Sequence, residues 1–328
     1  MKVMILGNTV CLENAYSMHE GISKLKLDGG FFGYRSFAQK YSPEKARSVI
    51  MELIRKNKPG WIFVQYQFSK LITPDWFKEM KQINPKCKIS LMSVDIRGHL
   101  DESTLKASKH VDVCFQKGKK DLYIKEGVNC KILQQGYSDL LFYKVKNIKK
   151  EYDLCFAGGH YKGASFPGTL ERVSTMNYLS RVFPKLTIIG KGWDKIVKPS
   201  QQQGHMDLRL INNIYNKTKV TLNINHYNNI KHYFSVRMIE GMASGSMMLT
   251  RYIPGLELYF ENHKDLVWFY SLSDCVDLAK YYIKNDKERE NIAINGLNKV
   301  QKYFRWEKIM QDAFHITFNN KRDHEDGF

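Results

Sequence analysis

Short apolar segments alternate with helical segments through the first half of the chain. Strand-like runs cover residues 2–6, 61–64 and 88–94, and further short runs cover 111–115 and 131–133. Helical periodicity follows Ser42 and Pro43, a cap and a first-turn proline that commonly begin a helix. A repeated strand-helix series implies a parallel sheet with helices on both faces. The sequence therefore predicts an α/β fold.

The same alternation restarts after a glycine-containing segment at 136–142 and a basic run at 144–150. A chain of 328 residues exceeds a usual single core, so two domains are expected. We place the first domain at 1–143 and the second at 151–318. The polar residues 319–328 are expected to form a frayed tail.

Composition narrows the class of protein. The apolar share is 43%, no apolar run approaches the roughly 20 residues needed to span a bilayer, and no signal segment follows Met1. Six cysteines lack Cys-x-x-Cys or histidine-partnered metal spacing. We expect reduced core thiols in a cytoplasmic, monomeric protein without a metal site.

The net charge of +18 is distributed unevenly. Residues 1–150 hold 27 Lys and Arg against 14 Asp and Glu, which gives +13, whereas the remainder holds 24 against 19, which gives +5. A general preference for lysine in this sequence would give both halves a similar excess of positive charge. The excess in the first half therefore favours an anionic partner there.

The segment 231–250 contains Ser235, Arg237 and Glu240 at the start of an expected short helix, followed by a buried strand. Arg237 and Glu240 are three residues apart and share a helix face. An exposed ion pair is one interpretation of that spacing. The other is a nucleotide-diphosphate site, in which the cation and the helix amides bind phosphate and the carboxylate accepts ribose hydroxyls.

A second glycine-containing turn follows the expected strand at 152–157. Gly158 and Gly159 would let the backbone approach a pyrophosphate, with Lys162 and Arg172 supplying positive charge. An ordinary turn is the alternative for these glycines. We include Gly190, directly after the expected strand 186–189, in the same predicted donor site.

Asp95 and Arg97 follow the strand-like run 88–94, at the sheet edge that faces the ligand crevice in wound α/β folds. A loop aspartate is equally compatible with a turn or a cap. His226 and His232 flank a loop and are expected to be surface or cleft contacts rather than metal ligands, although His232 is well placed to touch a donor sugar.

The pattern Ser235-x-Arg-x-x-Glu240-x-Met-Ala-Ser-Gly245 resembles the donor-binding segment of GT-B glycosyltransferases. The resemblance is closest to CgeB-like group 1 enzymes and to T-even phage DNA β-glucosyltransferases. It implies two Rossmann-like domains facing across a cleft, with the nucleotide sugar, a UDP-sugar, bound by the second domain. His232 stands where the retaining pattern has a glutamate, so we expect inversion.

The phage enzymes also have a similar Asp-Ile-Arg after the corresponding strand. The resemblance implies that Asp95 is the general base, that Arg97 orients it or meets acceptor phosphate, and that no cofactor is required. The acceptor it implies is a hydroxymethylated base in duplex DNA, bound in part by Lys117, Lys119 and Lys120. The protein would then act in the cytoplasm, the host cytoplasm if it is phage-encoded.

Two alternatives remain open. CgeB-like enzymes would allow a cell-surface polymer, a lipid carrier or a protein as acceptor. A non-enzymatic nucleic-acid-binding protein on a degenerate GT-B fold would also account for the basic first half.

Overall fold

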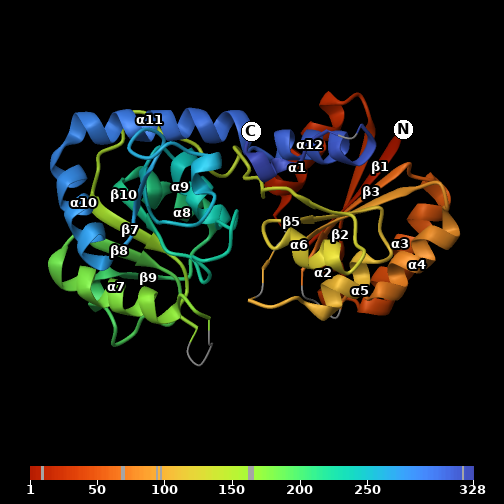
Figure 1. The fold of residues 1–328 in the computed structure, drawn as a ribbon, viewed down its shortest axis with the longest axis horizontal. Helices are drawn as coiled ribbons and strands as arrows, with labels where there is room; N and C mark the ends of the chain where they lie inside the picture. Colours follow the sequence, from red (N-terminus) through yellow and green to blue (C-terminus); the bar gives the residue numbers. More distant parts are fainter. Residues whose placement is uncertain (9–10, 68–70, 94, 97, 162–165, 320) are drawn as a thin grey trace. The chain divides into compact units, whose positions relative to one another are not determined.

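The computed structural model describes residues 1–328 apart from 9–10, 68–70, 94, 97, 162–165 and 320. The chain divides into two compact units (Figure 1). The first unit combines residues 1–138 with 305–327, and the second comprises 139–304 together with Phe328. The expected second domain extended to 318, but residues 305–318 belong with the first unit.

The first unit is built on a six-stranded sheet in the order β2-β1-β3-β4-β5-β6, with every pair parallel. Its strands are β1 (Lys2–Gly7), β2 (Asp28–Gly33), β3 (Trp61–Tyr66), β4 (Lys88–Ser93), β5 (Val113–Gln116) and β6 (Cys130–Ile132). Parallel pairing requires crossover connections, and the helices supply them.

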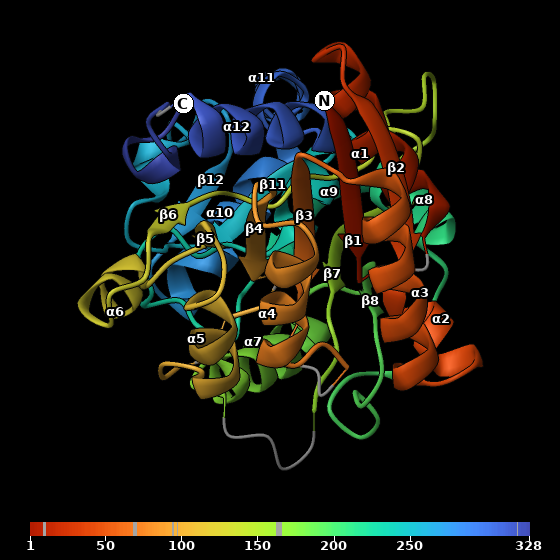
Figure 2. The same cartoon turned by 90° about the vertical axis from the view of Figure 1, so that its right-hand side faces the viewer.

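Helices cover both faces of this sheet. The first unit contains α1 (Leu12–Lys24), α2 (Tyr34–Lys40), α3 (Pro43–Asn57), α4 (Pro74–Ile83), α5 (Glu102–Ser108), α6 (Lys120–Lys125) and α12 (Trp306–Phe318). The expected cap of α3 is confirmed, because Ser42 Oγ accepts from the Lys45 amide at 3.1 Å. On the opposite face α12 packs beside α1, as Figures 1 and 2 show.

The second unit repeats the architecture with a parallel sheet in the order β12-β11-β10-β7-β8-β9. Its strands are β7 (Tyr152–Ala157), β8 (Leu186–Ile189), β9 (Gln202–Gly204), β10 (Thr218–Asn223), β11 (Met247–Arg251) and β12 (Val267–Phe269). Its α-helices are α7 (Thr169–Val182), α8 (Leu208–Asn216), α9 (Val236–Ala243), α10 (Leu272–Lys284) and α11 (Asp286–Tyr303). The predicted α/β fold with two parallel sheets is confirmed.

The expectation of a frayed C-terminal tail is wrong. His324 is 3% exposed, and its Nε2 lies 3.3 Å from Asp312 Oδ2 on α12. Asp323 Oδ2 accepts from the Ile132 amide at 2.9 Å, which attaches the tail to β6. The tail is therefore attached to the first unit through His324 and Asp323, while Lys321, Arg322 and Asp326 are exposed.

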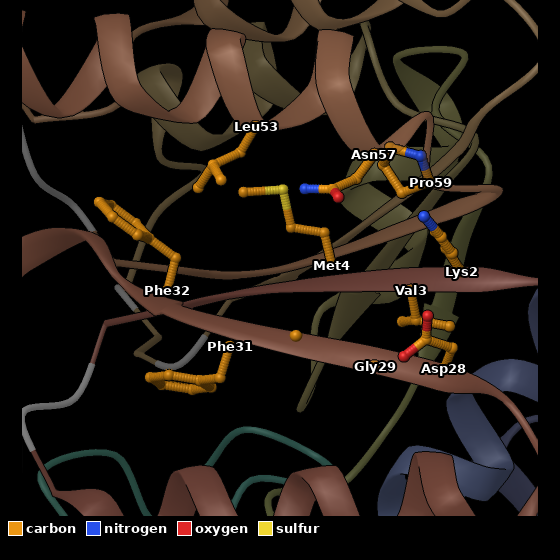
Figure 3. A pocket seen from close by; sticks show the side chains of 11 residues that line it. Lys2, Val3, Met4, Asp28, Gly29, Phe31, Phe32, Leu53, Asn57 and Pro59 are labelled. Atoms are coloured by element: carbon orange, nitrogen blue, oxygen red, sulfur yellow. The ribbon is translucent and has the colours of Figure 1, made fainter.

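A cavity of about 260 Å³ lies against β1, β2 and α3 in the first unit (Figure 3). Met4, Phe32 and Leu53 form an apolar part, while Lys2 and Asp28 lie at the start of the two strands. None of the predicted site residues lines it. In the part of the chain that the structure describes, no helix combines the length and hydrophobicity needed to cross a membrane.

Candidate functional site

A buried polar network fixes the start of α9 in the second unit. Ser235 is the N-cap residue, but its Oγ donates to Asn223 Oδ1 at 3.0 Å and does not cap its own helix. The Ser235 amide donates to Asn225 Oδ1 at 3.2 Å, and Asn223 Nδ2 donates to Thr250 Oγ1 at 2.9 Å. These bonds tie the helix to the carboxyl ends of β10 and β11. The first amides of α9 are left without a side-chain cap, so that helix end has a partial positive charge.

Arg237 and Glu240 lie on the first turn and a half of α9, and both are half-buried. The structure forms no ion pair between these two described residues, so the solvated-pair interpretation is not observed. Arg237 Nε is buried and has no hydrogen-bond partner among the residues that the structure describes. Burial raises the pKa of Glu240 to about 7, although the nearby Arg237 acts in the opposite direction. Both side chains therefore have unused hydrogen-bonding capacity.

Arg172, on α7, is 2% exposed and belongs to the same site. Its Nε donates to the Ile224 carbonyl at 2.7 Å, and its Nη1 lies 2.8 Å from His226 Nε2. Its Nη2 is buried and has no partner among the described residues. Burial and the neighbouring Arg237 lower the pKa of Arg172 to about 9, so it remains a cation at neutral pH.

His226 is neutral in this environment. Burial, Arg172 and Arg237 together lower the pKa of His226 to about 3. A neutral imidazole has one ring nitrogen that can accept a hydrogen bond, which suits it to the Arg172 guanidinium. His226 therefore orients a cation without neutralising it, and the positive charge of the two arginines is not cancelled by this contact.

The predicted glycine turn lies beside this pair of arginines. A Cβ placed on Gly158 would lie 4.0 Å from Arg237 Nε. Trp193 Nε1 donates to the Gly158 carbonyl at 2.7 Å. Gly190 has φ +134°, and a Cβ there would lie 2.4 Å from the Gly158 carbonyl oxygen. Only glycine at 190 allows the loops after β7 and β8 to pack this closely.

Of two further residues in the predicted donor site, the structure describes Gly159 but not Lys162. Gly159 continues the turn, where an added Cβ would meet the Tyr161 ring at 3.4 Å. Lys162 lies outside the described residues. The structure thus brings together Gly158, Gly190, Arg172, Arg237 and the start of α9, whereas the role of Lys162 stays a prediction.

His232 is 4% exposed, and its backbone has φ +69°, a conformation uncommon for a side chain of this size. Its amide donates to the Pro254 carbonyl at 3.0 Å, and its Nδ1 lies 3.1 Å from Tyr259 Oη. The structure therefore attaches His232 to the loop before and after Gly255. Its predicted contact with the donor sugar stays a prediction.

Asn225 is a site residue that sequence reasoning missed, and His226, expected to be a surface or cleft contact, lies against Arg172. Asn225 is 1% exposed, and its Nδ2 has no partner in the described structure. Both residues lie two to three positions after the end of β10, at the edge of a parallel sheet where ligands bind. That position is the one signal in the sequence that could have indicated a role in the site. Their contacts with Ser235 and Arg172 join distant segments and cannot be predicted from the sequence.

Asp95 is exposed at the carboxyl end of β4 in the first unit. Its Oδ2 accepts from Gln67 Nε2 at 2.8 Å, and its backbone carbonyl accepts from Ser93 Oγ at 2.8 Å. Arg97, predicted to orient Asp95, lies outside the described residues. A side chain that sequence reasoning did not consider, Gln67, makes the observed contact with the carboxylate.

The predicted acceptor lysines are occupied by contacts within the protein. Lys117 is 4% exposed and donates to Gln135 Oε1 at 3.1 Å. Lys119 donates to the Gly98 carbonyl, and burial lowers its pKa. Lys120 forms ion pairs with Asp323 and Glu325 of the tail. This segment packs against the loop after β4 and against the tail. The predicted role of the three lysines in acceptor binding stays a prediction.

The described residues contain no evident metal-binding site. Outside the twelve omitted positions, no group of three or more His, Cys, Asp or Glu side chains is arranged to hold an ion. The site therefore consists of two arginines, a carboxyl group, amide donors and glycine turns.

Comparison with known proteins agrees with this description. Residues 169–315 match a family described as glycosyl transferase-like. No curated protein matches the chain in sequence.

Solved structures with similar folds span nearly the whole chain. HepE of Anabaena in complex with UDP and glucose has a TM-score of 0.63 at 12% identity, covering 98% of this chain and 100% of its own. Sucrose-phosphate synthase from Thermosynechococcus elongatus has a TM-score of 0.66 at 11% identity, covering 98% and 99%. The lipopolysaccharide outer core galactosyltransferase WaaB has 0.58 at 10%, covering 98% and 100%.

These similarities confirm the predicted GT-B fold and the predicted resemblance to group 1-like glycosyltransferases. The predicted resemblance to the phage DNA glucosyltransferases stays a prediction.

Proposed function

We propose that this protein is a glycosyltransferase that moves a sugar from a UDP-sugar to an acceptor hydroxyl. One observation carries the proposal: two neighbouring guanidinium groups, Arg172 and Arg237, each keep a buried N–H donor without a partner in the described part of the chain. A buried cation without a counter-charge is costly, and an anionic ligand removes that cost. The diphosphate of a nucleotide sugar fits this site, because Gly158 and the start of α9 add backbone access and helix amides.

Glu240 is proposed to bind the ribose. A carboxyl group beside the phosphate site accepts two vicinal hydroxyls in charge-assisted hydrogen bonds. Similar folds bind such ligands: HepE has been solved with UDP, with UDP and glucose, and with UDP-glucose. These complexes support a UDP-sugar as donor for this chain.

Asp95 is proposed to act as the general base. Its carboxylate takes the proton from the acceptor hydroxyl while that oxygen attacks the anomeric carbon. The bond from that carbon to the diphosphate oxygen breaks, and UDP leaves with the bonding electrons. Arg172, Arg237 and the α9 amides stabilise the charge that develops on the leaving group, a role that needs no divalent cation. A direct displacement of this kind inverts the anomeric carbon.

For the acceptor, we propose a carbohydrate-containing polymer or lipid-linked glycan. The three lysines that would have followed a DNA backbone have partners within the protein. Among similar folds, WaaB is a lipopolysaccharide outer core galactosyltransferase, and TarM has been solved with α-GlcNAc-glycerol and UDP. The hydroxymethylated DNA base is the competing acceptor, supported by the net charge of +13 in residues 1–150.

Calorimetry with UDP tests the donor site. Glu240→Ala removes two charge-assisted hydrogen bonds worth about 1.5–3 kcal/mol each, so UDP affinity should fall at least tenfold. Asp277→Ala, at an exposed position of α10, is the matched control and should bind as the wild type does. Equal affinity in wild type and Glu240→Ala would contradict the assigned ribose contact.

An acceptor panel tests the second half of the proposal. Mass spectrometry would follow sugar transfer from a panel of UDP-sugars to a lipopolysaccharide core, a glycerol-phosphate polymer and hydroxymethylated DNA. Transfer to either of the first two supports the glycan acceptor. Transfer to DNA alone replaces it with the DNA acceptor.

A further inference from the structure

We propose that Gln67 is a positioning residue that fixes the orientation of the Asp95 carboxylate. The inference rests on the proposed role of Asp95 as general base. Gln67 Nε2 lies 2.8 Å from Asp95 Oδ2, a normal distance for an N–H···O hydrogen bond. Gln67 directly follows β3, and Asp95 lies two residues after β4, the neighbouring strand. The pair therefore lies at the carboxyl edge of the first sheet.

The orientation of the Gln67 amide is determined by two other donors. Asn8 Nδ2 lies 2.6 Å from Gln67 Oε1, and Arg35 Nη1 lies 2.7 Å from the same oxygen. An arginine guanidinium can only donate, so the atom facing Arg35 must be the amide oxygen. The amide nitrogen consequently faces Asp95, where it donates to the carboxylate.

The four residues follow the order of the strands. Arg35 lies in α2, immediately after β2, and Asn8 follows β1. In sheet order, β2 and β1 precede β3 and β4, so a chain of hydrogen bonds runs along the sheet edge from Arg35 and Asn8 through Gln67 to Asp95. Ser93 Oγ adds a bond to the Asp95 carbonyl, which holds the backbone of the same loop.

This arrangement gives the two oxygens of the Asp95 carboxylate different roles. Oδ2 is held by Gln67, and Oδ1 is the oxygen assigned to take the proton from the acceptor. A general base works efficiently only when its accepting oxygen is held in reach of the proton, and a side chain on an exposed loop does not maintain that geometry alone. Gln67 itself has no group that takes the proton, so its effect passes through Asp95.

Gln67→Glu is the sharpest variant, because it keeps the shape and one oxygen for Arg35 and Asn8 while replacing the N–H donor with an acceptor. We expect kcat to fall at least tenfold, with UDP affinity and the KM for the donor unchanged. Gln67→Met, which removes all the hydrogen bonds, should also lower kcat. Gln82→Met makes the same chemical change at an exposed position of α4 and should leave kcat unchanged.

A double-variant cycle distinguishes positioning from an independent role. If Gln67 acts through Asp95, then Gln67→Met in an Asp95→Asn background should cause no further loss of kcat. Losses that multiply would overturn the proposal, as would wild-type kcat in both Gln67 variants alongside a low kcat in Asp95→Asn. Wild-type turnover in Asp95→Asn would instead show that the assigned base is wrong, and the role of Gln67 would fall with it.

Discussion

The two units differ in how they satisfy their positive charges. In the first unit Lys120 pairs with Asp323 and Glu325, and Lys81 pairs with Asp112 at 2.6 Å. In the second unit Arg172 and Arg237 lie close together, and each has a buried donor atom to which no other described residue is hydrogen-bonded. The second unit thus holds two buried guanidinium donors that a ligand can use, although the sequence places the larger excess of charge in the first half.

This comparison shows why net charge alone is a weak guide to a binding site. A lysine held by a carboxylate contributes fully to the formal charge, but much of its field is cancelled locally. An arginine buried without an acid contributes the same single charge and retains a strong field in a poorly screened environment. The second kind of cation is the better indicator of an anionic ligand.

Asp95→Asn should have the largest effect of the variants, and that effect should be on turnover. It distinguishes a catalytic residue in the first unit from the UDP-binding residues in the second. Asparagine keeps the shape of the side chain but cannot take the proton, so turnover should fall by about 10²–10⁴. UDP affinity should not change, because the diphosphate site belongs to the second unit. Steady-state kinetics and calorimetry would measure both quantities. Turnover near the wild-type level would show that Asp95 is a turn residue.

Arg237→Met should have the next largest effect, on binding. Loss of one charge-assisted hydrogen bond to phosphate corresponds to about 1.5–3 kcal/mol, or about a 10- to 100-fold weaker affinity for UDP. The ligand-free protein should unfold at the same or a higher temperature, because the variant removes a half-buried cation that forms no ion pair with any described residue. Calorimetry and thermal unfolding would measure the two effects.

Arg181→Met provides the control for that variant, since Arg181 is exposed on α7. It should change neither UDP affinity nor the unfolding temperature. A clear drop in the unfolding temperature of Arg237→Met would contradict the view that Arg237 is held for a ligand rather than for stability.

Much of the fold could be predicted from the sequence because apolar runs and caps are local signals. One strand that was not predicted is β2, which contains Gly29, Gly30 and Gly33 and has none of the β-branched side chains that usually mark a strand. Its place beside β1 is determined by tertiary pairing. The tail was misjudged for a similar reason: His324 is polar by composition but is buried through its contact with Asp312.

The candidate site was predictable where spacing along one helix was sufficient, as for Arg237 and Glu240. Asn225, His226 and Gln67 all lie shortly after strands, which the sequence can indicate. Their contacts join segments that are far apart in the chain, so the sequence does not show what they bind. The sequence also could not show that Lys117 is buried, since a lysine is usually exposed.

Glu240→Gln should change how stability depends on pH, because burial raises the pKa of Glu240 to about 7. Between its unfolded value near 4.5 and about 7, the folded state binds more protons than the unfolded state, so the Glu240 contribution to stability declines as pH rises through this window. Glutamine does not titrate. The variant should therefore gain about 1–3 kcal/mol relative to wild type between pH 4.5 and pH 8.

Urea unfolding of wild type and Glu240→Gln at about pH 4.5 and about pH 8 would measure the change in their stability difference. Asp277→Asn, at an exposed position in the same unit, should show no comparable change between the two pH values. A Glu240→Gln stability difference that is equal at both pH values would mean that the carboxyl group is not desolvated in the folded protein.

Lys120→Met should have the smallest effect. It tests whether this lysine of the first unit is held by acidic residues of the protein rather than by a ligand. Its side chain is 14% exposed and pairs with Asp323, which is 10% exposed. Loss of this partly buried pair should cost about 1–2 kcal/mol of stability, whereas Lys125→Met, on the exposed side of the same helix, should cost nothing measurable. Each phosphate neutralised on duplex DNA contributes about 0.9 to the slope of log affinity against log salt, so Lys120→Met should leave that slope unchanged. If the slope instead falls by about 0.9 while stability is unaffected, Lys120 faces a phosphate, and the positive charge of the first unit is available to DNA after all.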